Sequence, residues 1–234
     1  MSTLYVVATP IGNLGDMTLR ALDTLKLVDV IYAEDTRVTH KLLDRYTIDK
    51  PLLSYREAAP RPQVERTIAG IIDRLGKGES VAYVSDAGTP GVSDPGSFLV
   101  GRVVEAGFTV VPIPGASTVS TLMSISGMPI TRLLFLGFLP KKKGHATLMG
   151  KIKVGLTDEV YEGIMLYESP ERIVKLLEEI LSWKLDLSIC LGRELTKMHE
   201  EVLRGTVEEV HAILKKRASI KGEIALLVYP TVHD

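Results

Sequence analysis

The sequence predicts an α/β protein built from two domains. Short β-branched apolar runs, bounded by glycine, proline or polar residues, alternate with longer segments whose apolar residues recur at helical spacing. Over residues 3–125 this alternation is typical of a parallel sheet covered by helices. At 234 residues, with 45% hydrophobic and 24% charged side chains, the chain has the size and composition of a globular protein with one large domain or two small ones.

Strands and helices alternate through the first half of the chain. The expected strands are Leu4–Ala8, Val30–Ala33, Val81–Val84 and Thr109–Ile113, and the expected helices are Thr18–Leu27, Gln63–Leu75 and Ser97–Glu105. The first helix carries an apolar stripe of Leu19, Leu22 and Leu25. Asp16 and Thr18 precede this stripe, and both are residue types that cap helices.

The second half repeats the alternation with other start and stop signals. The expected strands are Leu133–Leu139, Ile164–Tyr167, Leu187–Leu191 and Glu223–Tyr229. Ser169-Pro170-Glu171 predicts a helix that runs to Leu181, with serine as N-cap and proline in the first turn. Thr206-Val207-Glu208-Glu209 is a capping box that starts a helix to Lys216. Glycine and proline interrupt the pattern near Gly127–Arg132, so we expect domains of residues 1–126 and 127–234 with a ligand cleft between them.

Composition excludes several classes of protein and site. The longest apolar stretch, near Leu133–Leu139, is too short to cross a bilayer, so no membrane partner is expected. A single cysteine, Cys190, excludes an internal disulfide and a thiolate metal cluster, and the five histidines lack ligand spacing, so no metal is expected. No basic segment precedes the first strand, which with the lone cysteine indicates a cytoplasmic protein. With 28 basic and 29 acidic side chains, any nucleic acid must be held by local basic clusters.

Distinctive loops, three of them rich in glycine and proline, follow several of the expected strands. They are Thr9–Asn13, Glu34–Arg37, Ser85–Gly96 and Pro114–Thr118. One such loop alone would be read as a turn. In an open α/β sheet, however, ligands bind outside the carboxyl ends of the strands, where all of these loops are expected. Together they predict a ligand site at one edge of the first sheet.

The chemistry of these loops limits the classes of ligand that can bind there. Neither the G-x-x-x-x-G-K-[ST] phosphate loop nor the G-x-G-x-x-G dinucleotide motif is present. Proline removes amide donors, so the loops offer mainly carbonyl groups, a poor match to pyrophosphate. Asp86 and Asp94 add negative charge, while Ser117 and Thr118 offer hydroxyls and amides at a helix start. This inventory fits a neutral or cationic ligand, such as an adenosyl amino acid with a positive sulfonium.

The order and spacing of these segments resemble the tetrapyrrole methylase superfamily and, within it, the family of 16S ribosomal RNA (cytidine-2′-O)-methyltransferases. The matching segments span nearly the whole chain; they are Ala8–Asp16, Thr18–Leu22, Ala33–Arg37, Ser85–Gly96, Pro112–Ser117, Gly137–Pro140, Tyr167–Pro170 with Arg172, Gly192–Lys197, Gly205-Thr206 and Gly222–Ile224. The resemblance implies two α/β domains of the tetrapyrrole methylase type. The first would hold a mainly parallel sheet and the second a mixed sheet, with the cofactor cleft between them.

The same resemblance implies a function. It predicts an S-adenosyl-L-methionine-dependent enzyme that methylates the 2′-hydroxyl of a cytidine ribose in 16S ribosomal RNA, acting on that RNA or on the small ribosomal subunit. It also implies a homodimer. Two alternatives remain open from the sequence: a methyltransferase of the same superfamily that acts on a tetrapyrrole or a diphthamide precursor, and a non-catalytic ribosome-assembly factor that retains the fold.

The resemblance also assigns cofactor-binding residues, mostly through loop backbone. The expected residues are Pro10, Ile11, Gly12, Asp86, Gly88, Thr89, Pro90, Gly115, Ala116, Ser117, Thr118, Leu166, Tyr167, Ile224 and Ala225. Thr89 stands where tetrapyrrole enzymes carry an acidic residue, and Asp86 is the nearby carboxylate that can replace it.

Methyl transfer to a ribose hydroxyl is an in-line displacement that gains from a base. The candidate bases are Asp35, Asp94 and Glu168. Each has a structural alternative: Asp35 can pair with Arg37, Asp94 can cap a helix, and Glu168 can brace the helix that follows it. The candidate RNA contacts are Arg37, Arg56, Arg61, Lys141, Lys142, Lys143, Arg193 and Lys197. The lysine triplet stands where relatives carry an arginine-rich stretch, and its alternative interpretation is an exposed loop.

Overall fold

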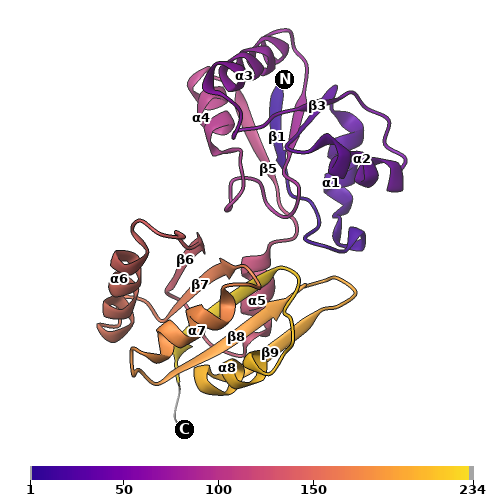
Figure 1. Cartoon of the computed structure of the whole chain (residues 1–234). Coiled ribbons are helices and arrows are strands. Elements are labelled where there is room, and N and C mark those ends of the chain that lie inside the picture. Colours follow the sequence, from indigo (N-terminus) through magenta and orange to yellow (C-terminus); the bar gives the residue numbers. More distant parts are fainter. Residues whose placement is uncertain (1, 232–234) are drawn as a thin grey trace. The chain divides into compact units, whose positions relative to one another are not determined.

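The structure, a computed structural model, describes residues 2–231. The chain divides into two compact units, Met1–Ser117 and Thr118–Asp234 (Figure 1). The division falls before helix α5 (Thr118–Ser126), whereas the glycine and proline pattern placed it after this segment. The reason is packing: α5 lies against strands β8 (Leu187–Arg193) and β10 (Ile224–Pro230) of the second unit.

The first unit is built on a five-stranded parallel sheet in the order β3-β2-β4-β1-β5. The strands are β1 (Thr3–Val7), β2 (Val30–Ala33), β3 (Leu52–Ser54), β4 (Val81–Val84) and β5 (Thr109–Ile113). The expected apolar runs thus form strands, and the parallel arrangement is confirmed. The short β3 was not among the expected strands, because it is largely exposed and carries no apolar run.

Helices cover both faces of this sheet. They are α1 (Leu19–Leu27), α2 (Thr36–Arg45), α3 (Arg61–Gly76) and α4 (Ser97–Glu105), with a 3₁₀ turn at Leu14–Asp16. Because strand residues alternate between faces, Val84 packs with α1 and α2 while its neighbour Tyr83 packs with α3 and α4. Thr18 caps α1, its hydroxyl accepting the Ala21 N–H at 3.1 Å, whereas Asp16 lies in the 3₁₀ turn.

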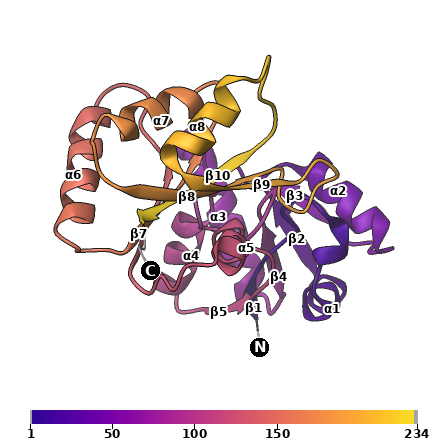
Figure 2. The same cartoon turned by 90° about the horizontal axis from the view of Figure 1, so that it is seen from below.

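The second unit contains a five-stranded mixed sheet in the order β6-β7-β10-β8-β9. Its further strands are β6 (Leu133–Phe138), β7 (Gly163–Glu168) and β9 (Glu201–Thr206). β6 and β7 run parallel and the other neighbours are antiparallel, as the resemblance predicted. Helices α6 (His145–Thr157), α7 (Ile173–Leu181) and α8 (Val207–Lys215) share one apolar core with the sheet, while α5 lies on the opposite face (Figure 2).

Helix α7 begins later than the sequence predicted. Ser169 was expected as its N-cap, but the helix starts at Ile173, and Arg172 is its N-cap without a side-chain hydrogen bond. The Ser169 hydroxyl instead accepts a hydrogen bond from Arg172 Nε at 3.2 Å, while the Ser169 carbonyl accepts the N–H groups of Arg172 and Ile173. Residues 169–172 therefore form a turn before the helix. None of the helices described here is long and apolar enough to cross a membrane.

The capping box of α8 forms as predicted and yields a stability test. The Thr206 hydroxyl accepts the Glu209 N–H at 3.2 Å, and the Glu209 carboxylate accepts the Thr206 N–H at 2.9 Å. We expect Thr206→Ala to lower the free energy of unfolding by about 0.5–2 kcal/mol in urea titrations, because a helix-start N–H loses its partner. Thr157→Ala is the control, since that exposed hydroxyl bonds only a carbonyl within α6; equal losses would contradict the cap's role.

Candidate functional site

Four loops leave the carboxyl edge of the first sheet and are joined to one another. We call Thr9–Asn13, Glu34–Arg37, Ser85–Gly96 and Pro114–Ser117 the loop edge; they follow β1, β2, β4 and β5. Thr9 and Gly88 exchange two backbone hydrogen bonds, of 2.8 and 3.1 Å. Thr89 Oγ1 donates to the Ala116 carbonyl at 3.3 Å, and the Asp86 carboxylate accepts the Asp35 N–H at 2.9 Å. The loops therefore form one connected surface at one edge.

Two glycines allow the loops to approach this closely. Gly88 has φ +79°, and a Cβ there would lie 3.2 Å from Ile11 Cγ2. A Cβ on Gly115 would lie 3.0 Å from the Cβ of Ala8. Of the other expected cofactor residues in this unit, Pro10, Ile11 and Pro90 are buried, Thr89, Ala116 and Ser117 are half-buried, and Gly12 and Asp86 are exposed. Backbone rather than long side chains thus makes up this surface.

The carboxylates of the loop edge differ in how readily they bind a proton. Glu34, the residue after β2, is half-buried, and its pKa is raised, first by burial and then by the charges of Asp86 and Asp94. Asp35 has the opposite behaviour: it caps α2 and pairs with Arg37 Nη2 at 2.5 Å, and the guanidinium holds its pKa well below the usual range. The sequence predicted Asp35 as a candidate base but did not indicate Glu34. The polar motif Glu34–Arg37 does not reveal that the Glu34 side chain is half-buried.

A polar anchor holds the far end of the Ser85–Gly96 loop. Glu57, between β3 and α3, accepts the Gly96 N–H at 2.8 Å and the Tyr55 hydroxyl at 3.3 Å. The Tyr55 ring meets the Tyr83 ring edge-on at 5.4 Å, and the fully buried Tyr83 hydroxyl has no hydrogen-bond partner among residues 2–231. Burial raises the pKa of Tyr83, so the phenol stays neutral. Glu57 was not among the expected site residues, because its partner lies far along the chain.

The second unit presents its expected cofactor residues on two different faces. Tyr167 pairs with Ala225 across β7 and β10, on the face opposite α6, α7 and α8. Leu166 and Ile224 belong to the apolar core beneath those helices. Their side chains therefore lie in the core, and their strands are paired on both sides. Thr118 is the first residue of α5 and is half-buried.

Glu168, another expected base, is buried in an ion pair. Its carboxylate accepts the Ser169 N–H at 2.6 Å and the Arg172 guanidinium at 2.5 Å. The Glu168 side chain is only 3% exposed, so removal of its charge would leave Arg172 without its partner in a partly buried site. This geometry matches the structural alternative for Glu168, which is to brace the segment that leads into the following helix. Asp94 lies half-buried in the Ser85–Gly96 loop and contributes to the electrostatics of Glu34 and Tyr83.

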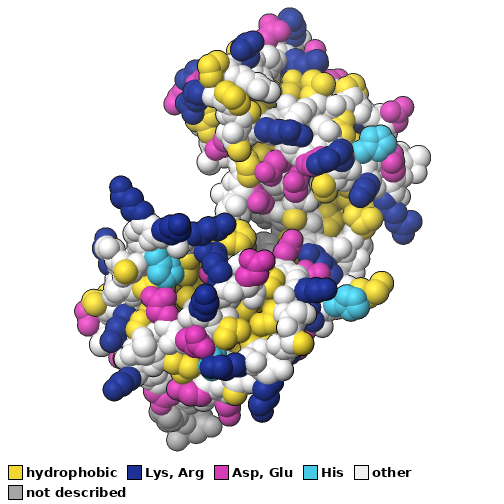
Figure 3. All heavy atoms as spheres, in the orientation of Figure 1, with side chains coloured by type: hydrophobic (Ala, Val, Ile, Leu, Met, Phe, Trp, Pro, Cys, Tyr) yellow, Lys and Arg dark blue, Asp and Glu magenta, His cyan; other side chains and the backbone are white. Residues whose placement is uncertain are grey.

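The expected RNA-contacting cations differ in exposure: some have exposed side chains, and others are partly buried in ion pairs. The exposed side chains are Arg37, Arg56 and Lys141–Lys143. The lysines lie between β6 and α6, where basic side chains gather on the surface in Figure 3. Arg61 is exposed but lies 3.7 Å above the Phe98 ring and pairs with Glu65.

Arg193 and Lys197 are engaged in ion pairs. Arg193 Nε lies 2.8 Å from the Glu201 carboxylate, which also binds Arg217 at 2.5 Å. Lys197 Nζ lies 3.0 Å from both Glu194 and Glu223. These two cations thus stabilise the β8–β9 hairpin and its surroundings in the second unit.

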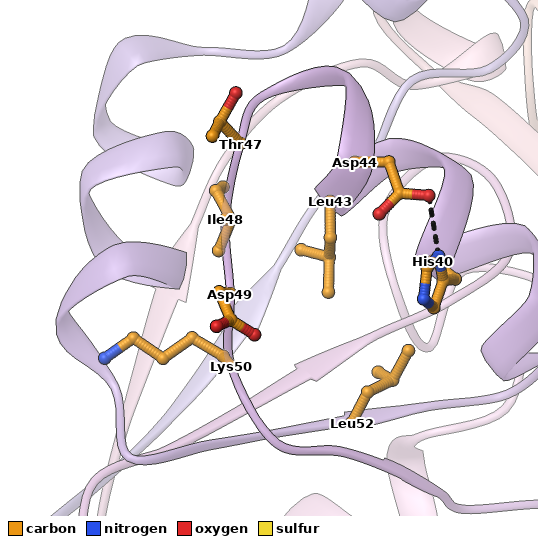
Figure 4. A pocket seen from close by; sticks show the side chains of 8 residues that line it. All are labelled: His40, Leu43, Asp44, Thr47, Ile48, Asp49, Lys50 and Leu52. Carbon is orange, nitrogen blue, oxygen red and sulfur yellow. Dashed lines mark hydrogen bonds and ion pairs between the residues drawn. The ribbon is translucent and has the colours of Figure 1, made fainter.

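A surface pocket lies elsewhere in the first unit, at the end of α2 and the segment that enters β3 (Figure 4). It is lined by His40, Leu43, Asp44, Thr47, Ile48, Asp49, Lys50 and Leu52. His40 pairs with Asp44 at 2.8 Å. None of these residues belongs to the loop edge or to the expected site. Among residues 2–231, no group of three or more His, Cys, Asp or Glu side chains is arranged to hold a metal ion.

The Gly96 geometry yields a prediction with a matched control in the same segment. Gly96 has φ +129°, and a Cβ there would lie 2.6 Å from Tyr83 Cε1. We expect Gly96→Ala to lower the free energy of unfolding by about 1–3 kcal/mol, because the buried ring cannot move away without cost. Gly101→Ala in α4 has nothing within 4 Å of the new Cβ and should raise stability by up to about 1 kcal/mol. Urea titrations that rank the two the other way would refute the argument.

The Glu201 cluster predicts a dependence of stability on pH. Arg217, followed by Arg193, lowers the Glu201 pKa to about 2. A lowered folded-state pKa stabilises the protein above the unfolded-state value of about 4.3, and this stabilisation is lost as the pH falls toward 2. The difference in unfolding free energy between wild type and Glu201→Gln should therefore shrink from about pH 5 to about pH 2. Glu171→Gln, at an exposed carboxylate, serves as the control; a difference that does not vary with pH would rule out this account.

The chain was compared with known proteins. The family model for tetrapyrrole (corrin/porphyrin) methylases matches residues 3–211. A protein of Borrelia garinii subsp. bavariensis named ribosomal RNA small subunit methyltransferase I is 44% identical over 96% of this chain and 97% of its own length. A protein of the same name from Halalkalibacterium halodurans is 44% identical over 97% of this chain and 75% of its own length. Another, from Thermotoga maritima, is 40% identical over 97% of this chain and 98% of its own length.

Solved structures share the fold at lower identity. The uroporphyrin-III-C-methyltransferase from Thermus thermophilus superposes with a TM-score of 0.63 at 20% identity, covering 98% of this chain and 94% of that chain. The cobalt precorrin-4 methyltransferase CbiF gives a TM-score of 0.62 at 18% identity, covering 96% and 94%. At this level of identity the likeness concerns the fold alone.

Proposed function

Because the chain belongs to the family of tetrapyrrole (corrin/porphyrin) methylases and, within it, to the ribosomal RNA small subunit methyltransferase I proteins, we propose that it methylates small-subunit ribosomal RNA. The proposed reaction is S-adenosyl-L-methionine-dependent 2′-O-methylation of a cytidine in 16S ribosomal RNA, carried out in the cytoplasm. The observation that carries this proposal is the identity of 40–44% with the relatives named above over nearly the whole chain. The connected loop edge supplies a surface for the methyl donor.

The loop edge fits a cationic adenosyl ligand better than a phosphate. Asp86 and Asp94 lie close enough to Glu34 for their charges to raise its pKa, and this negative potential favours a positive sulfur. The close backbone approach at Gly88 and Gly115 suits contacts made by main-chain groups. When bound, S-adenosylmethionine supplies the methyl group to be transferred. The first unit would hold it through Pro10–Gly12, Gly88–Pro90 and Gly115–Ser117.

We propose Glu34, rather than Asp35 or Glu168, as the proton acceptor for the ribose hydroxyl. Its pKa is raised, whereas that of Asp35 is lowered by Arg37, so Glu34 takes up a proton more readily. Glu168 is committed to Arg172 in a buried pair. Asp86 and Asp94 would act on Glu34 through their charge. A positioned base of this kind contributes about 10²–10⁴-fold to a rate.

This assignment predicts a loss of rate at Glu34. We expect Glu34→Gln to lower kcat by about 10²–10⁴-fold with little change in affinity for the methyl donor, because only the proton acceptor is removed. In the wild type, kcat should fall as the pH drops through the raised Glu34 pKa, since the protonated carboxyl cannot accept a proton.

Asp35→Asn is the comparison, because asparagine also caps a helix. Its loss of kcat should be smaller than that of Glu34→Gln, and the pH dependence of kcat should remain. A larger loss at Asp35 than at Glu34 would transfer the role to Asp35.

Further roles follow from the same proposal. Arg37, Arg56, Arg61 and Lys141–Lys143 are proposed to contact phosphates of the RNA, with Arg193 and Lys197 contributing mainly through the ion pairs that shape their surface. Binding carried by such cations weakens as salt rises. We also propose that the protein acts as a homodimer.

Two measurements test the function. Calorimetry with S-adenosylmethionine should give saturable binding, which a ribosome-assembly factor without activity need not show. Transfer of a radiolabelled methyl group should then be measured on purified small subunits from a strain lacking the enzyme, with nuclease mapping of the product and a porphyrin precursor as the competing substrate. Label in a 16S ribosomal RNA cytidine is the expected result; label in the porphyrin alone would replace the proposal with the tetrapyrrole alternative.

A further inference from the structure

Three aromatic side chains form a cluster on β6 and β7 of the second unit. The Tyr167 ring lies 5.4 Å from the Phe135 ring at 71° and 5.4 Å from the Phe138 ring at 62°. Both contacts are edge-to-face, an arrangement that stabilises aromatic pairs beyond the area they bury. We call Phe135, Phe138 and Tyr167 the aromatic cluster.

A bulge in β6 brings the three rings onto one face. Phe135 pairs with Met165 and Phe138 pairs with Tyr167, but the register shifts between Phe135 and Gly137, which has φ +59°. In an unbroken strand, residues 135 and 138 would point to opposite faces. The extra residue, Leu136, packs with the helix-side core, and the cluster therefore lies on the face away from α6, α7 and α8.

The outermost ring of the cluster is exposed beside concentrated positive charge. Phe138 is 63% exposed, although phenylalanine is a residue that folding usually buries. Lys141, Lys142 and Lys143 follow it closely in the chain and are all exposed. None of these lysines forms an ion pair with another described residue. The exposed Phe138 ring packs on Tyr167, which packs on Phe135, and three exposed lysines follow it in the chain. A ring and cations of this kind provide the two contacts that single-stranded nucleic acid requires.

We propose that Phe138, supported by Tyr167 and Phe135, is a stacking platform for one unpaired base of the RNA strand whose phosphates bind Lys141–Lys143. This inference rests on the proposed function and names where the substrate strand is held. The exposed lysines that follow Phe138 favour an anionic occupant, and self-association of this chain is an outcome of the test below. Base stacking needs no particular base, so the platform would orient the strand rather than select its sequence.

The test separates base stacking from phosphate binding. Fluorescence anisotropy measures the affinity of the full chain for a short oligocytidylate and for an abasic oligomer of the same length. We expect Phe138→Ala to weaken oligocytidylate binding about 5- to 150-fold and to leave abasic binding unchanged. Phe138→Tyr should retain wild-type affinity, since the tyrosine ring also stacks. Val160→Ala is the matched control, because Val160 is also 63% exposed in the same unit but lies outside the aromatic cluster.

Other outcomes are equally informative. Replacing all three lysines with glutamine should weaken the binding of both oligomers and reduce the salt dependence of that binding. Equal affinities of Phe138→Ala and wild type for oligocytidylate would overturn the platform, as would equal losses for both oligomers. A change from dimer to monomer in Phe138→Ala by analytical ultracentrifugation, without loss of RNA affinity, would assign the surface to self-association instead. Wild-type methyl transfer to small subunits is measured separately, so the proposed function can fail or stand on its own.

Discussion

The pair of backbone hydrogen bonds between Thr9 and Gly88 is the contact on which the rest of the proposed site depends. It joins the loops that follow β1 and β4, the neighbouring strands in the middle of the parallel sheet. Thr89 then reaches Ala116 after β5, and Asp86 reaches the Asp35 backbone after β2. Because these links use mainly main-chain groups, proline and glycine can shape the loops while the hydrogen bonds keep them in register. Long side chains are not needed to build the surface.

The carboxylates of the two units have different roles because their surroundings differ. Arg37 neutralises Asp35, and Arg172 neutralises Glu168, so each of these pairs stabilises local structure. Glu57 is bound by the Gly96 N–H and thereby fixes the end of a loop. Glu34 lies instead among like charges in a partly buried position, which raises its pKa. The same functional group is thus a cap, a brace, an anchor or a group that binds a proton more readily, according to its neighbours.

The sequence predicted what depends on local pattern and missed what depends on tertiary contact. Buried strands such as Val81–Val84 are continuous apolar runs, and the Thr206 capping box is a contiguous motif, so both were found. β9 was missed because its residues are half exposed and form an antiparallel pair only with β8. Glu57 and Glu34 were missed because their burial and partners come from distant segments. The cofactor contact expected at Leu166 stays a prediction, and strand alternation places its side chain in the core.

The two units divide the demands of the proposed reaction between them. A small charged methyl donor needs a rigid, negatively charged surface with close backbone approach, and the first unit supplies this through short loops on a parallel sheet. A long flexible strand of RNA needs cations for its phosphates and exposed rings for its bases. In the second unit, the β6 bulge and the lysines after it supply these features. On the loop edge Arg37 is neutralised by Asp35, whereas the lysine triplet belongs to the second unit, outside the fold that holds Glu34, Asp86 and Asp94. The lysines therefore keep their charge for phosphate groups.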